Sequence, residues 1–196
     1  LETREVTNVT QDSYYDSSPS WSADGSEVVY NRRIGEFAKI FTVDVNDPNR
    51  KTQISFGPWS DIEPVLSRDG KEAFFSSDRS GGIFNLFSVD LETAKIRQLT
   101  DVVGGVFAPL EMAPADDGTR RLTFSAFYAG MFRLYVMPIP PKESSEWKEP
   151  FGEEAAVPEG ERTAPGGDIP EAEPFRPPLQ LTLDEEQKRP YKLVWN

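Results

Sequence analysis

The hydrophobic positions of this chain fall into short runs that polar residues, Gly and Pro interrupt. The runs at 27–30, 72–75 and 121–124 read Glu-Val-Val-Tyr, Glu-Ala-Phe-Phe and Arg-Leu-Thr-Phe. Such β-branched and aromatic runs are typical of strands. Each run follows a dipeptide suited to the positive φ angles of a tight hairpin, namely Asp24-Gly25, Asp69-Gly70 and Asp117-Gly118. The pattern predicts a series of β-hairpins.

The hairpins recur with a period of about 45 residues. Pro19, Pro64 and Pro109 stand 45 residues apart and open successive copies. Third strands are predicted at 39–43, 85–89 and 133–137, and last strands at 4–7, 52–55, 97–100 and 179–182. Four strands repeated at this spacing are the signature of β-propeller blades.

The repeat also predicts the organisation of the chain. Residues 1–15 carry the last strand of a preceding blade, and the chain ends in a tail at 184–196. Between them we expect three blades, at 16–57, 58–103 and 104–183. The third is interrupted by an insertion at 138–178, which holds 10 of the 17 Pro and has ten acidic against four basic residues over 142–176. Such a segment buries little apolar area, so we expect an extended or partly disordered excursion.

Composition excludes several kinds of function. The 33 acidic and 21 basic residues give a net charge of −12, which repels nucleic acids and anionic lipid surfaces. No apolar run is long enough to span a membrane. The chain has neither Cys nor His, so it lacks thiol nucleophiles, the commonest general base and the usual zinc ligands. We therefore expect no catalytic residues, no cofactor and no metal.

One copy carries a resemblance to a known family. Residues 76–82 read Ser-Ser-Asp-Arg-Ser-Gly-Gly, residues 85–90 read Asn-Leu-Phe-Ser-Val-Asp, and residues 97–100 read Arg-Gln-Leu-Thr. This copy resembles the TolB-like (WD-like) β-propeller repeat, and the likeness covers about residues 4–137 and 179–183. It implies an all-β fold, a partial β-propeller of about three four-stranded antiparallel blades plus one strand of a preceding blade.

The resemblance implies several functions. The family includes periplasmic components of bacterial envelope machinery, gating propellers of serine peptidases and sugar-acting lyases. The peptidases also need a Gly-x-Ser-x-Gly motif, which is absent here, and the lyase-type sites depend on a His-bound metal. The role that remains is that of a binding platform.

Several residues that could carry a function also have a structural explanation. Asp24, Asp69 and Asp117 are interpreted as turn formers, and the local Asp78-Arg79 pair as a weak surface pair. Basic pairs such as Arg32-Arg33 are expected to be solvated. Trp21 is expected to pack in the core. The candidate partner contacts are aromatic residues in connections, in the insertion and in the tail, namely Trp59, Phe107, Phe127, Tyr128, Trp147, Phe151, Tyr191 and Trp195.

A closed propeller has about four to eight blades, so three blades leave faces that either the rest of a longer chain or another subunit must cover. We expect a non-catalytic protein-binding scaffold, an exported, periplasmic extrinsic subunit of a larger membrane-associated bacterial complex. Its partners would be other protein subunits. One alternative is a gating or regulatory propeller segment of a serine peptidase. Another is a propeller that binds a glycan or small ligand without metal.

Overall fold

The computed structural model describes residues 6–148 and contains three antiparallel sheets in that part of the chain. The first sheet comprises β1 (Asp16–Trp21), β2 (Glu27–Ile34), β3 (Phe37–Asp44) and β4 (Lys51–Gln53). The second comprises β5 (Asp61–Leu66), β6 (Glu72–Ser77), β7 (Asn85–Asp90) and β8 (Ile96–Gln98). The third comprises β9 (Val106–Glu111), β10 (Arg121–Tyr128) and β11 (Met131–Pro138), and a short 3-10 helix, η1 (Lys142–Ser144), follows it.

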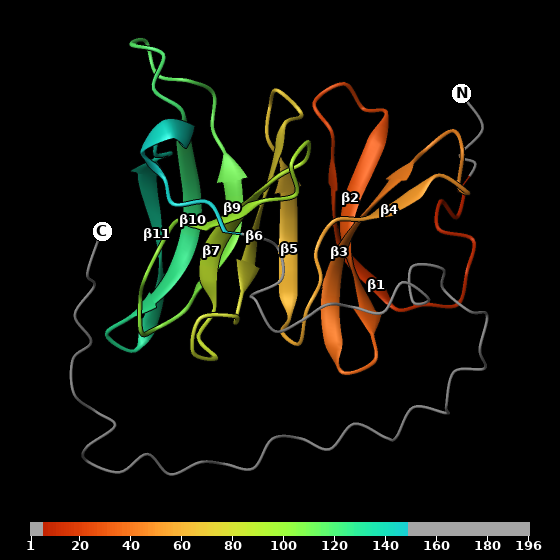
Figure 1. Cartoon of the computed structure of the whole chain (residues 1–196), viewed down its shortest axis with the longest axis horizontal. Coiled ribbons are helices and arrows are strands. Elements are labelled where there is room, and N and C mark those ends of the chain that lie inside the picture. Colours follow the sequence, from red (N-terminus) through yellow and green to blue (C-terminus); the bar gives the residue numbers. More distant parts are fainter. Residues whose placement is uncertain (1–5, 149–196) are drawn as a thin grey trace.

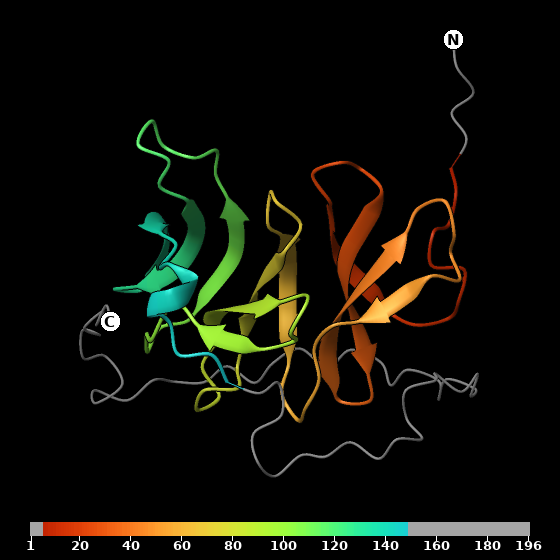
Figure 2. The ribbon, with the colours of Figure 1, turned by 45° about the horizontal axis from the view of Figure 1, so that its top comes forward.

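The three sheets stand side by side as blades 1, 2 and 3 (Figures 1 and 2). Within each blade the strands follow one another in chain order, as hairpins dictate. The first strands are neighbours, since β5 contacts both β1 and β9. The prediction of an all-β partial propeller is confirmed.

Two strands expected at the ends of the repeat are not among the described elements. Val6 and Thr7 form no strand, and the rest of the predicted strand at 4–7 lies outside the described residues. The predicted last strand of blade 3, at 179–182, also lies outside them. The described part of blade 3 therefore has three strands.

Every first strand carries a bulge at the same place in the repeat. Ser18, Glu63 and Ala108 have φ angles of 52°, 53° and 52°, and each precedes the Pro that opens its copy. The register of the first strand against the second shifts there in all three blades. The Glu63 N–H donates to Asn31 Oδ1 (3.2 Å), and the Ala108 N–H donates to Glu63 Oε2 (2.6 Å). The bulges of blades 2 and 3 are thus each hydrogen-bonded to the preceding blade.

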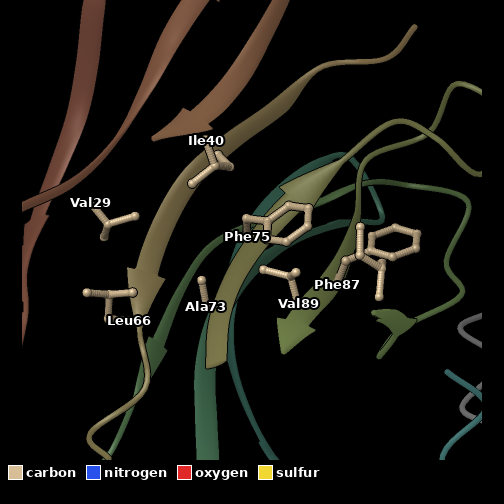
Figure 3. Packing of buried hydrophobic residues seen from close by; sticks show 8 residues of the cluster. Val29, Ile40, Leu66, Ala73, Phe75, Phe87 and Val89 are labelled. Atoms are coloured by element: carbon tan, nitrogen blue, oxygen red, sulfur yellow. The ribbon is translucent and has the colours of Figure 1, made fainter. Parts of the chain in front are cut away.

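The cores lie between the blades. Val29 and Ile40 of blade 1 pack against Leu66, Ala73 and Phe75 of blade 2 (Figure 3). A second cluster joins the other face of blade 2 to blade 3, and its buried members are Phe74, Leu86, Val102, Val106, Leu122, Phe124, Ala126 and Ile139. Alternation along each strand sends successive side chains to opposite faces, so one blade contributes to two cores.

Trp21 is exposed by 63%, so the prediction that it packs in the core is wrong. It lies on β1, the first strand of the first described blade. Among residues 6–148, no helix is long and apolar enough to cross a membrane.

Candidate functional site

The aromatic candidates gather at one end of the blades because of strand direction. In an antiparallel blade the first and third strands begin where the second ends. Trp59 precedes β5 and Phe107 lies at the start of β9, while Phe127 and Tyr128 lie at the end of β10. We call this end, with its connections, the aromatic end.

Four phenylalanines are in contact at the aromatic end of blades 2 and 3. The Phe107 ring lies 5.4 Å from that of Phe84 and 5.9 Å from that of Phe132, centroid to centroid. Phe132 in turn packs edge-on against Phe127 at 5.2 Å. Phe132 is exposed by 60% although its ring has these neighbours. The cluster is a partly exposed aromatic surface, the kind of surface that anchors protein contacts.

A cation cluster lies beside Trp59 at the same end. The Arg79 guanidinium lies 5.0 Å from the Trp59 ring centroid, and its Nη2 is 2.7 Å from Oδ1 of the fully buried Asp61. Lys39 Nζ is 3.5 Å from the other Asp61 oxygen and donates to the Trp59 carbonyl. Burial lowers the pKa of Lys39, although the Asp61 charge opposes this effect. Both cations are therefore held in place by one buried carboxylate.

Arg79 and Arg32 do not have the exposed positions that the sequence predicted for them. Arg79 pairs with Asp61, 18 residues away, and only 11% of its side chain is exposed, so it does not form the weak surface pair expected with Asp78. Arg32 is also buried, and it pairs with Asp12 and Asp16 at 2.9 and 2.7 Å. Both ion pairs could have been predicted from the repeat, since Asp16 and Asp61 begin β1 and β5 and stand 45 residues apart.

A cleft of about 580 Å³ opens next to this cluster. Trp59 and Arg79 line one part of it, Phe87 and Gln98 another, and Ser144 and Lys148 the part formed by the chain after blade 3. Among the described residues, no group of three His, Cys, Asp or Glu residues could hold a metal ion. The cleft offers stacking and hydrogen bonding to a ligand.

Trp147 packs within the chain. Its ring centroid lies 4.7 Å from the Arg97 guanidinium, and its indole N–H donates to the Lys142 carbonyl (2.9 Å). Next to it, Lys148 exchanges two backbone hydrogen bonds of 2.8 and 2.9 Å with Ile96 of β8. The start of the insertion is thus docked on the outer edge of blade 2. Phe151, Tyr191 and Trp195 lie outside the described residues.

The structure places the six turn residues in the hairpins between first and second strands. Gly25, Gly70 and Gly118 have φ angles of 73°, 68° and 80°. Asp24 Oδ1 accepts from the Ser22 hydroxyl (2.7 Å), and Asp69 Oδ1 accepts from the Ser67 hydroxyl (2.6 Å). In blade 3, Asp117 Oδ1 accepts from the Thr119 N–H (2.9 Å). Hydrogen bonds from Ser22 and Ser26 lower the pKa of Asp24 to about 2.

The far face of blade 3 is apolar and exposed. Leu134 pairs with Ser125 at the register position that Ile40 and Leu86 occupy in blades 1 and 2. Ile40 and Leu86 are 0% exposed because the next blade covers them, whereas Leu134 is 82% exposed. Sequence reasoning missed this face as a site. Aligning the three third strands would have predicted it, since Leu134 aligns with the core residues Ile40 and Leu86.

No protein-family model and no curated protein sequence matches the chain. Solved structures do. The described blades superpose on a putative TolB from Agrobacterium tumefaciens with a TM-score of 0.55 and 20% identity, covering 73% of this chain and 51% of that one. The TolB of Acinetobacter baumannii (TM-score 0.48, 17% identity, 66% and 31% covered) is also similar. So is a puromycin-hydrolysing peptidase of Mycobacterium tuberculosis (TM-score 0.47, 20% identity, 69% and 22% covered).

The putative TolB from Agrobacterium tumefaciens shows the fold, since the other two structures superpose less closely. This chain spans about half the length of that protein, by the 51% covered. The repeat, the blade topology and this superposition agree. Residues 6–148 have the fold of a TolB-like β-propeller segment.

Proposed function

We propose that this chain is a non-catalytic scaffold that binds protein through the far face of blade 3 and through the aromatic end. The observation that carries the proposal is the 82% exposure of Leu134, whose counterparts in blades 1 and 2 are 0% exposed. Its apolar neighbours Phe132 and Val136 are exposed as well. A surface built like a blade interface is suited to bury apolar area against another folded surface.

The aromatic end supports the same role. Its four phenylalanines and Trp59 are held by ring contacts and by the cation cluster, so they are already ordered before any partner binds. Ordered aromatic anchors lose little conformational entropy on association. We extend the proposal to an exported subunit of a membrane-associated bacterial complex, in keeping with the TolB-like fold.

A photo-crosslinking amino acid at Leu134, in the protein expressed in its native source, tests the proposal. Glu92, exposed in the β7–β8 turn, is the matched control position. We expect Leu134 to crosslink to one defined protein surface and Glu92 to crosslink to none. Equal and scattered products at both positions would contradict the binding role. An intact mass that includes a hydrolase domain on the same chain would favour a peptidase gate instead.

A further inference from the structure

The outer edge of β11 lacks the strand that closes the other two blades. Among residues 6–148, β11 pairs with β10 alone, whereas β3 also pairs with β4 and β7 also pairs with β8. An unpaired edge presents a row of backbone donors and acceptors to any strand that fits it. The closed blades show what such a strand must contain.

Blade 1 is closed by three hydrogen bonds that involve Gln53, Ile54 and Ser55. The Ile40 N–H donates to the Ser55 hydroxyl (2.8 Å), and the Ile40 carbonyl accepts from the Ile54 N–H (2.9 Å). The Gln53 side-chain amide donates to the Ser55 carbonyl (2.8 Å). We call this set of bonds the closing clip.

Blade 2 repeats the closing clip. The Leu86 N–H donates to the Thr100 hydroxyl (2.9 Å), and the Leu86 carbonyl accepts from the Leu99 N–H (2.8 Å). The Gln98 side-chain amide donates to the Thr100 carbonyl (2.7 Å). In both blades the clip is formed by Gln, an apolar residue, and Ser or Thr in succession.

A Gln followed by Ile or Leu and then by Ser or Thr occurs at three places in the sequence, and the third is Gln180-Leu181-Thr182. We propose that the outer edge of β11 is a strand-acceptor site and that residues 179–182 of this chain occupy it through a third closing clip. The proposal goes beyond the binding role, and it does not depend on it. The Leu134 N–H would donate to the Thr182 hydroxyl, and the Leu134 carbonyl would accept from the Leu181 N–H, as the backbone groups of Ile40 and Leu86 do in blades 1 and 2.

The register follows from the closed blades. Val43 pairs with Lys51 and Val89 pairs with Ile96, two residues before the Gln in each pairing strand. The corresponding pair in blade 3 is Met137 with Pro178. Pro178 fits this place because the N–H of its counterpart Ile96 points away from β7, toward the Lys148 carbonyl.

Proline also marks where the pairing ends. The Asp44 N–H donates to the Arg50 carbonyl (3.2 Å), and the Asp90 N–H donates to the Lys95 carbonyl (2.9 Å). The counterpart of both Asp residues in β11 is Pro138, which has no N–H to donate. The strands would part at the place where the insertion begins. The entropy of closing a loop rises only slowly with its length, so a long insertion is compatible with the clip.

Engineered cysteines test the register, since the chain has no Cys of its own. Met137→Cys with Pro178→Cys places the thiols at a non-hydrogen-bonded pair, where antiparallel strands are close enough for a disulfide. Met137→Cys with Leu181→Cys is the control, with nearly the same loop length. In the full chain we expect the first pair to form an intramolecular disulfide about tenfold or more faster than the second. Equal rates, or disulfides between molecules, would overturn the proposal.

Amide hydrogen exchange gives a second, independent readout. Thr182→Val removes the hydroxyl that would accept from the Leu134 N–H, and Thr182→Ser keeps it. We expect faster exchange at the Leu134 amide in Thr182→Val alone, just as Thr100→Val should speed exchange at Leu86. Suppose that Thr100→Val speeds exchange of the Leu86 amide while Thr182→Val leaves the exchange rate of the Leu134 amide unchanged. Residues 179–182 then do not occupy the edge.

Discussion

The Arg97 guanidinium and the Glu72 carboxylate form an ion pair of 2.9 Å in which the two side chains are exposed by 1% and 0%. Arg97 Nη1 also donates to the Pro140 carbonyl and to the Ser145 hydroxyl, both at 2.8 Å. The face of the same guanidinium lies against Trp147. One buried cation thus joins the second blade to the chain that leaves the third.

Replacing Arg97 by Met should destabilise the fold strongly. The substitution leaves the Glu72 carboxylate buried with Arg120 and Lys142 as its remaining cations, at 3.2 and 3.6 Å. Loss of one partner from a buried pair costs about 3–5 kcal/mol. Urea unfolding measures the change in the free energy of unfolding. Arg50→Met, at a pair whose Arg is 72% exposed, is the control and should change it by less than about 0.5 kcal/mol. A small effect of Arg97→Met would mean that water reaches Glu72.

Stability should fall in acid partly through Asp90. Burial alone would raise the pKa of Asp90, but hydrogen bonds from Lys142 and Thr93 lower it from 3.8 to about 2. Because the folded-state pKa is below the unfolded-state pKa, the stabilisation is present above about pH 4 and is lost as the pH falls toward 2. Urea unfolding at several pH values in this window should show that the free energy of unfolding falls less steeply with decreasing pH in Asp90→Asn than in the wild type. Parallel curves would contradict the ion pair with Lys142.

Equivalent leucines of blades 2 and 3 should differ in their cost of truncation. Leu86→Ala removes a side chain that is 0% exposed and should cost about 2–5 kcal/mol. Leu134→Ala, in the same register but 82% exposed, should change the free energy of unfolding of this chain by about 0.5 kcal/mol or less. Denaturant titration of both variants makes the comparison. Equal costs would show that the far face of blade 3 is covered within the chain.

A methyl group at Gly57 should displace Trp59 from Arg79. A Cβ there would lie 2.3 Å from the Trp59 ring, and Gly57 has a φ of 98°. Gly57→Ala should cost about 2–4 kcal/mol from overpacking and from the positive φ together. The NMR signal of the Trp59 indole should shift as well. Gly35→Ala also has a positive φ but meets nothing within 4 Å, so it should cost less and leave Trp59 in place.

The repeat and its hairpins could be predicted because their signals are local. The hairpin turn at Asp69 and Gly70 is held by hydrogen bonds to residues two or three positions away, so its cause lies in neighbouring residues of the sequence. The strands after the turns follow from their own composition. Three copies in register then determine the propeller, because a single blade cannot bury both of its faces.

The charged clusters could not be predicted because their partners are distant in sequence. Arg97 meets Glu72, 25 residues away, only when blade 2 forms, and it meets Trp147 only when the chain crosses back to β8. A charged residue inside a strand is expected at the surface unless its partner is known. The prediction for Trp21 is wrong for the opposite reason. An aromatic residue suggests a core position, but Trp21 lies on the first described blade and is exposed.

The bulge before each repeat Pro bears on how blades can be exchanged between positions. The Glu63 amide needs the Asn31 side chain of the blade before it, and the Ala108 amide needs the Glu63 side chain. A duplicated blade carries its own strands and turns to a new site, but it leaves this acceptor behind. A blade moved to a new position therefore keeps this hydrogen bond only where its new neighbour offers a side-chain oxygen at that point.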